Sequence, residues 1–214
     1  MSFPGLFITF EGGDGVGKTT QVEAVARRLS DDGRTVLLTR EPGGTVLGLG
    51  IRELLLRAGW HIDPHAEALL FAADRAQHIR TTVLPALDAG TFVVQDRYID
   101  SSVAYQGAGR GLGTDEIRRL GLWAAGGLLP DLTILLDLDA DAAAARVRHG
   151  GGPADRLESE SPEFRARLRD GFLGIARREP ERFLVVDASL PAGVVTALVV
   201  DEISRRASRP APRA

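Results

Sequence analysis

The segment that most constrains the fold of this chain is a glycine-rich stretch near its start, Gly12-Gly-Asp-Gly-Val-Gly-Lys-Thr19. It follows an apolar run, Leu6 to Phe10, and opens a segment with helical spacing, Thr19 to Ser30. A strand, a turn with the spacing G-x-x-x-x-G-K-[ST] and a helix form a P-loop, whose backbone N–H groups and helix N-terminus surround phosphate oxygens. We therefore expect a nucleoside triphosphate to be bound by Gly12, Gly13, Asp14, Gly15, Val16, Gly17, Lys18, Thr19 and Thr20.

Lys18 is the only lysine in the 214 residues, and every other long basic side chain is an arginine. A compact ammonium suits a tight anion site better than the wide planar fork of arginine. We predict that Lys18 bridges the β- and γ-phosphates and that the Thr19 hydroxyl holds Mg²⁺. The alternatives are a glycine-rich turn that binds nothing and a single lysine that has survived by chance.

Apolar runs alternate with segments of helical spacing along the whole chain. The predicted strands are Leu6 to Phe10, Thr35 to Thr39, Phe92 to Gln95, Leu132 to Asp137 and Phe183 to Val186. The predicted helices are Thr19 to Ser30, Val46 to Arg57, His65 to Ala89, Thr114 to Ala125, Ala140 to Arg148, Pro162 to Arg178 and Pro191 to Arg206. Short β-branched runs between helices suit buried parallel strands. We expect an α/β three-layer sandwich with a five-stranded parallel sheet.

The length and composition fit one globular domain, for which we expect residues 1–206, because no repeat or linker divides the chain. A Gly-Gly-Gly-Pro stretch between His149 and Asp155, with arginines on both sides, predicts a short lid over about residues 146–158. The Arg- and Pro-rich segment 207–214 predicts a flexible tail.

Composition excludes several classes of partner. The formal net charge of -3 gives no basic field for a nucleic-acid backbone, and the absence of cysteine excludes disulfides and thiolate zinc sites. We find no signal-peptide pattern and no run of about 18 apolar residues, so we expect no membrane partner. Because an enzyme that consumes a triphosphate needs the pool inside cells, we expect a cytoplasmic location.

P-loops serve GTPase switches, motor ATPases and small-molecule kinases. The chain contains no asparagine, so it cannot carry the Asn-Lys-x-Asp motif that reads guanine. Motor and DNA-handling ATPases are usually larger or more basic. The size fits a small-molecule kinase.

Four separated blocks resemble thymidylate kinases, and the resemblance runs from Phe7 to about Ala188. The blocks are Phe10-Glu-Gly-Gly-Asp-Gly-Val-Gly-Lys-Thr-Thr-Gln21, Thr39-Arg-Glu-Pro-Gly-Gly-Thr45, Leu70-Phe-Ala-Ala-Asp-Arg-Ala-Gln-His78, and Asp96-Arg-Tyr98 continuing to Ala104-Tyr-Gln-Gly107. The resemblance implies a P-loop nucleoside monophosphate kinase fold and Mg²⁺-dependent transfer of the ATP γ-phosphoryl group to dTMP, giving dTDP on the way to dTTP. It also implies a homodimer.

The resemblance implies an acceptor site rich in arginine. Arg52 and Arg97 would hold the dTMP phosphate with bidentate forks. Phe71 would stack on thymine while Arg75, one helical turn later, bonds a thymine carbonyl. Without the resemblance, a core aromatic and a solvated helix charge would be the favoured interpretations of Phe71 and Arg75.

Further residues are placed around the sugar and the phosphates by the same resemblance. Tyr105 would crowd a ribose 2′-hydroxyl, with Ser101 in the same wall and Gln106 near the base. Asp14 would meet the 3′-hydroxyl or a magnesium-bound water, and Asp96 would lie in the magnesium shell or orient the acceptor. Glu41 would lie in the acceptor pocket, and a role in stabilising the turn before Pro42 is nearly as plausible.

Phosphoryl transfer also needs a positive charge that comes close to the migrating phosphoryl group late in the reaction, called the late cation below. Some family members carry this arginine in the P-loop, where this chain has Gly15, and others carry it in a lid. Arg148 and Arg156 are the lid candidates, ahead of Arg146, so the expected catalytic set is Lys18, Asp96, Arg97, Arg148 and Arg156. The remaining alternatives are a kinase for another deoxynucleotide or deoxynucleoside and a nucleotide-binding module without turnover.

Overall fold

The structure is a computed structural model that describes residues 3–57, 59–149, 156–157 and 159–208. Part of the predicted lid, residues 150–155 and 158, lies outside the described residues, and so do residues 209–214 of the predicted tail.

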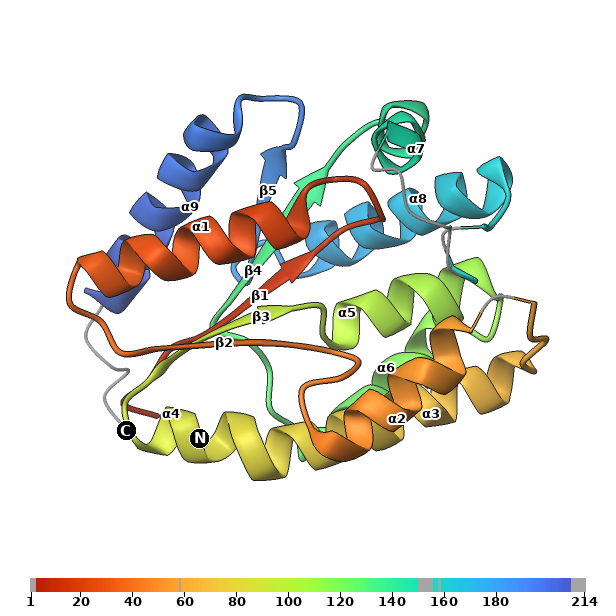
Figure 1. Ribbon diagram of the computed structural model, residues 1–214, viewed down its shortest axis with the longest axis horizontal. Helices are drawn as coiled ribbons and strands as arrows, with labels where there is room; N and C mark the ends of the chain where they lie inside the picture. Colours follow the sequence, from red (N-terminus) through yellow and green to blue (C-terminus); the bar gives the residue numbers. More distant parts are fainter. Residues whose placement is uncertain (1–2, 58, 150–155, 158, 209–214) are drawn as a thin grey trace.

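Five parallel strands form one sheet in the order β2-β3-β1-β4-β5, as the apolar runs predict (Figure 1). Their bounds are β1 (Phe7–Glu11), β2 (Val36–Arg40), β3 (Phe92–Asp96), β4 (Leu132–Asp137) and β5 (Phe183–Asp187). Every residue of the central strand β1 is buried, because helices cover both faces of the sheet. The predicted α/β three-layer sandwich is confirmed.

Helices α1 (Lys18–Asp31) and α9 (Ala192–Ala207) cover one face, where Val22 and Val199 pack on Ile8 and Ile134. The opposite face carries a longer helical set. It comprises α3 (Pro64–His78), which continues through the π-helical segment η1 (Ile79–Val83) into α4 (Leu84–Asp88), together with α5 (Ile99–Ser102), the π-helical segment η2 (Val103–Gly109), α6 (Thr114–Ala124) and α8 (Pro162–Arg178). Helix α2 (Val46–Leu56) packs on α3, and α7 (Ala140–His149) packs on α8.

The helical stretch Ile99–Gly109 is not among the helices predicted from sequence. Its serines and glycines have low helix propensity, so local preference does not reveal it. It forms because almost all of its side chains are buried, with Tyr105 packed edge-on against Phe172 of α8. Gly171 of α8 permits this close approach, since a Cβ there would lie 3.0 Å from the Ala108 Cβ.

The carboxyl ends of all five strands meet at one edge of the sheet, and β1 lies between β3 and β4 at the point where the chain changes direction across the sheet. Ligands of open α/β sheets bind at such a switch point. The P-loop directly follows β1 at this edge. Within the described residues, no helix combines the length and apolarity needed to cross a membrane.

Candidate active site

The glycine-rich stretch folds as a tight loop between β1 and α1. Gly12, Gly15 and Gly17 all have positive φ, and a Cβ at Gly15 would lie 2.3 Å from the Ala143 carbonyl oxygen. This backbone therefore leaves no room for an arginine side chain at position 15. The catalytic arginine that some family members carry in the P-loop must come from elsewhere in this chain.

Lys18 begins α1 and is almost fully buried, with Nζ donating to the Gly13 carbonyl at 2.5 Å. Burial lowers the pKa of this ammonium to about 8, with Arg97 acting in the same direction and Asp14 and Asp96 opposing it. A phosphate bound beside Lys18 would supply a negative charge and restore the stabilisation that the ammonium loses on burial.

We predict that ATP affinity falls as the pH rises through the pKa of Lys18. A bound triphosphate favours the charged form of Lys18. Above about pH 8 Lys18 is mostly neutral in the free chain, so it must take up a proton when ATP binds. With excess Mg²⁺, which keeps the γ-phosphate ionised, the dissociation constant of ATP should rise about tenfold between pH 7 and pH 9. Titration calorimetry measures it. Lys18→Arg, charged throughout this range, should show a flat profile, and a flat wild-type profile would contradict the prediction.

Thr19 and Asp96 lie together beside the loop, with Thr19 Oγ1 donating to Asp96 Oδ2 at 3.4 Å. Asp96 Oδ1 is buried and has no hydrogen-bond partner among the described residues. An orphaned carboxylate oxygen beside a hydroxyl offers the hard oxygen ligands that Mg²⁺ takes. The described residues hold no cluster of three or more Asp, Glu, His or Cys side chains able to bind a metal by themselves. The site fits an ion that is also held by phosphates and water.

Arg97 and Asp14 join the P-loop to the end of β3. Arg97 donates to the Gly12 carbonyl at 3.1 Å and to Ser101 Oγ at 3.2 Å, and it forms an ion pair with Asp14. Tyr105 Oη donates to the other Asp14 oxygen at 2.8 Å. Burial by itself raises the pKa of Asp14, but Arg97, Lys18 and the tyrosine bond hold it below its ordinary value. Arg97 has a φ of 66°, a strained value for a side chain of this size.

Glu11, at the end of β1, is a site residue that the sequence analysis does not assign. It is fully buried and accepts from the Tyr98 N–H at 2.8 Å and from Ser101 Oγ at 2.5 Å. Burial and the neighbouring Asp100 raise the pKa of Glu11 to about 7. Its one sequence signal is a carboxylate placed directly between an apolar run and the P-loop.

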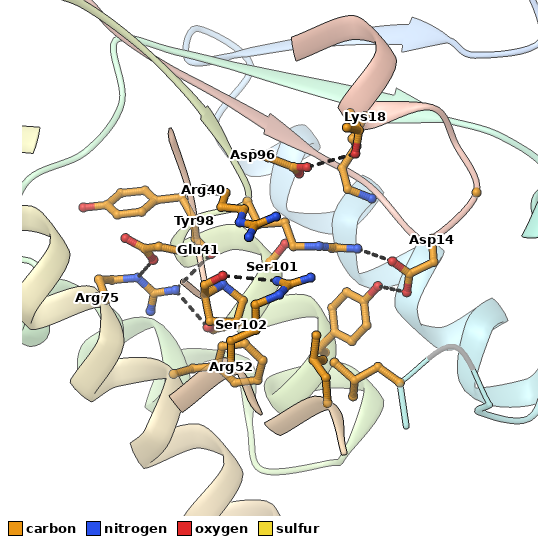
Figure 2. Close-up of a pocket in the computed structure, with 18 of the residues that line it drawn as sticks. Asp14, Lys18, Arg40, Glu41, Arg52, Arg75, Asp96, Tyr98, Ser101 and Ser102 are labelled. Carbon is orange, nitrogen blue, oxygen red and sulfur yellow. Dashed lines mark hydrogen bonds and ion pairs between the residues drawn. The ribbon is translucent and has the colours of Figure 1, made fainter. Parts of the chain in front are cut away.

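A cavity of about 430 Å³ opens beside the P-loop, and side chains from the ends of β2 and β3 and from α3 and α5 surround it (Figure 2). Of the residues predicted to bind the acceptor, it is lined by Asp14, Glu41, Arg52, Phe71, Arg75, Arg97, Ser101, Tyr105 and Gln106. Arg40, Tyr98 and Ser102 line it as well, although the sequence analysis does not assign them. The fold thus collects residues from five separate stretches of sequence around one space.

Glu41 and Arg75 form a buried pair at the far wall of this cavity. Arg75 Nε donates to Glu41 Oε2 at 2.9 Å, and its Nη2 donates to the Tyr98 carbonyl and to Ser102 Oγ, both at 3.1 Å. His78 Nδ1 lies 3.0 Å from the other Glu41 oxygen. Glu41 therefore fixes the arginine in place, and Arg75 is not the solvated helix charge that spacing alone would favour.

Phe71 and Arg52 line the cavity from two helices that pack together, α3 and α2. Phe71 of α3 is half-buried and lines the cavity, so it is not an ordinary core aromatic. Arg52 of α2 donates through Nη1 to the Pro42 carbonyl at 3.1 Å. That bond holds the guanidinium at the turn after β2, beside the cavity.

The lid arginines lie in different places. Arg146 lines the 430 Å³ cavity and donates to the Ala188 carbonyl at 3.1 Å. Arg148 is exposed at the end of α7 and lines a second cavity of about 360 Å³ behind the P-loop. Arg156 lines neither cavity; its Nε donates to the Leu55 carbonyl at 2.8 Å and its Nη2 lies 2.5 Å from Glu67 Oε2.

A P-loop at the switch point of a five-stranded parallel sheet, with an arginine-lined cavity beside it, defines a P-loop kinase of the nucleoside monophosphate kinase fold. The family model "Thymidylate kinase" matches residues 10–199. This chain belongs to the thymidylate kinase family.

Individual relatives agree over nearly the whole chain. It is 60% identical to a thymidylate kinase of Clavibacter michiganensis over 195 residues, which cover 91% of this chain and 92% of the relative. It is 52% identical to one of Bifidobacterium longum, covering 95% and 99% of the two chains. The crystal structure of a thymidylate kinase from Ehrlichia chaffeensis superposes with a TM-score of 0.76 at 35% identity and covers 93% of this chain and 98% of its own.

Proposed function

We propose that this chain is a dTMP kinase, which transfers the γ-phosphoryl group of ATP to dTMP and releases ADP and dTDP. Membership of the thymidylate kinase family supports this function. The observation that carries it in the structure is the single cavity shared by the P-loop side chains Lys18 and Thr19 and the acceptor-side residues Phe71 and Arg97. A donor triphosphate and an acceptor phosphate would meet there.

Two arginines are proposed to hold the acceptor phosphate. Arg97 stands between the P-loop and the cavity, and Arg52 reaches the cavity from α2. Their fixed charges offset the repulsion between the dianionic acceptor and the triphosphate, and so allow in-line attack by a dTMP oxygen on the γ-phosphorus. Asp14, held by Arg97 and Tyr105, is placed to accept from the sugar 3′-hydroxyl or from a water.

The donor side is assigned to the P-loop. Backbone N–H groups from Gly12 to Thr20 cradle the phosphates, and Lys18 neutralises the charge that develops on the migrating group. Thr19 and Asp96 would hold Mg²⁺, which supplies further neutralisation of the phosphate oxygens when bound.

The base and sugar contacts are proposed from the cavity walls. Phe71 would stack on thymine, and Arg75 and Gln106 would meet its polar edge. Tyr105 and Ser101 close the side next to the sugar, where a 2′-hydroxyl would meet the tyrosine ring.

Arg148 is our proposal for the late cation, because it lines the second cavity together with the P-loop residues Gly12 and Gly13. Arg146, two residues earlier on α7, lines the other cavity. Arg156, also a candidate from sequence, is held at Glu67 and Leu55, which suits a positioning role.

A panel of acceptors tests the proposed function. With ATP as donor, we expect kcat/KM for dTMP to exceed that for dUMP, dCMP, dGMP and thymidine. Thymidine lacks the phosphate that the two arginines would hold, cytosine lacks the carbonyl that Arg75 would bond, guanine is larger, and uracil lacks the methyl group. Coupled ADP release measures it. A preference of more than about tenfold for another acceptor would contradict the assignment, and ADP release that does not depend on any acceptor would point to a module without transfer.

We also propose a homodimer. Trp123 of α6 and Leu69 of α3 are exposed apolar side chains on helices that pack together. Sedimentation equilibrium should return twice the chain mass, and a monomer mass would overturn this proposal. Because the reaction consumes ATP, the cytoplasmic location stays a prediction that follows from the function.

A further inference from the structure

A buried carboxylate, Glu67 of α3, lies behind the base end of the cavity and outside its lining. Its Oε1 accepts from Gln106 Nε2 at 2.7 Å and from Arg110 Nε at 3.3 Å. Its Oε2 accepts from Arg110 Nη2 at 3.3 Å and lies 2.5 Å from Arg156 Nη2, a charge contact without hydrogen-bond alignment. The two oxygens therefore have different neighbours: one faces the amide, and the other faces mainly arginines.

Glu67 can only accept hydrogen bonds in this setting. Burial by itself raises its pKa, but the bonds from Gln106 and Arg110 and the charges of Arg110 and Arg156 hold the pKa below its ordinary value. An ionised carboxylate has no proton to donate. The amide beside it must turn its NH₂ group toward the carboxylate.

This requirement fixes the other end of the amide. Gln106 is almost fully buried and lines the cavity, and its Oε1 receives no hydrogen bond from the described residues. With one Nε2 hydrogen bonded to Glu67, the NH₂ group is turned toward the carboxylate, and the carbonyl oxygen, an acceptor, is the amide group left on the cavity side. Thymine and uracil carry a hydrogen on N3, whereas cytosine has a lone pair there.

We propose that Glu67 is a specificity-determining positioning residue: it fixes the orientation of the Gln106 amide and thereby selects pyrimidine monophosphates that carry N3–H over dCMP. The inference rests on the proposed function, because it requires a pyrimidine in the cavity. The Gln106 oxygen accepts from N3–H of thymine or uracil, and it faces the N3 lone pair of cytosine without a proton between them.

Glu67→Gln reverses the geometry without changing the size of the side chain. Two arginine nitrogens, Arg110 Nη2 and Arg156 Nη2, face the Oε2 position and only Arg110 Nε faces the Oε1 position, so an oxygen is favoured at Oε2. The new NH₂ group therefore takes the Oε1 position and faces Gln106. The Gln106 amide then turns its oxygen to residue 67 and its NH₂ group to the cavity, where it suits cytosine N3.

The test uses equilibrium dissociation constants of dTMP, dUMP and dCMP, measured by calorimetry on the full chain. In Glu67→Gln we expect the ratio of the dCMP constant to the dTMP constant to fall at least about tenfold. The ratio of dUMP to dTMP should change by less than about twofold, because both bases carry N3–H. An unchanged dCMP ratio, or an equal change in the dUMP ratio, would overturn the proposal.

Arg110→Lys is the matched control, because it loses the guanidinium fork that bonds both Glu67 oxygens but keeps a positive charge that holds the carboxylate ionised beside Gln106. Both ratios should stay within about twofold of wild type, and a fall like that of Glu67→Gln would show general loosening of the cluster instead. If Glu67→Gln does not fold, the double variant with Arg110→Met restores the charge balance and should show the same fall. Failure of the wild-type chain to bind dTMP would count against the proposed function, separately from this inference.

Discussion

Replacing Lys18 with alanine lowers phosphoryl transfer roughly a hundred- to a thousandfold, the range seen when one preorganised group that stabilises a transition state is removed. The ammonium is buried at the P-loop and has lost part of its solvation, as the fall of its pKa to about 8 indicates. A migrating phosphoryl group supplies the missing counter-charge. Steady-state kinetics with saturating dTMP and ATP measures the loss in kcat.

The fold should survive this substitution. Lys18 donates to one carbonyl, that of Gly13, and alanine removes a buried charge whose desolvation is unfavourable, so the thermal midpoint should equal or exceed that of the wild-type chain. Because the chain has no other lysine, an amine-directed reagent reaches only Lys18 and the N-terminal amine, and ATP should protect Lys18. Near-normal turnover in a folded Lys18→Ala variant would contradict the proposed mechanism.

Arg97→Lys is expected to lower kcat/KM for dTMP about a hundredfold, although the positive charge is kept. Arg97 holds Asp14, the Gly12 carbonyl and Ser101 at the same time through a planar fork, and lysine presents a single nitrogen. The loss should appear mainly with dTMP as the varied substrate, and initial-rate kinetics measures it.

Tyr105→Phe is the matched control for Arg97→Lys, because it removes the other hydrogen bond to Asp14 and no charge. Its effect on kcat/KM should stay below about tenfold, since one neutral hydrogen bond is lost. An equal loss in the two variants would mean that Asp14, and not the guanidinium fork, governs the site.

The sheet and the P-loop could be predicted because their signals are local. Short β-branched runs such as Leu132 to Asp137 have the composition of buried strands, and the loop spacing fixes its own backbone. The stretch Ile99–Gly109 could not be predicted in the same way, because its helical form depends on packing against α6 and α8.

Roles for individual site residues came from the family resemblance, and they stay predictions; the structure shows that the residues assigned to the acceptor line one cavity. Interactions between distant residues stayed hidden: Asp14 meets Arg97 and Tyr105 only after folding. The left-handed backbone of Arg97 has no sequence signal, and the bond from its N–H to the Phe10 carbonyl forms only after folding.

Arg156 has a contact that its place in the sequence does not indicate. It follows the glycine-rich stretch expected to close over phosphates, and its guanidinium lies at Glu67 on α3. From sequence, Glu67 looks like a solvent-exposed charge on an amphipathic helix. Only the folded structure shows that it is buried and bonded by Gln106 and Arg110.

The most direct test of the account follows the γ-phosphorus itself. With γ-labelled ATP, dTMP and Mg²⁺, the label should appear in dTDP at a rate equal to ADP release, because the cavity beside Lys18 and Arg97 brings donor and acceptor together. Label recovered as inorganic phosphate while dTMP stays unlabelled would contradict phosphoryl transfer to this acceptor.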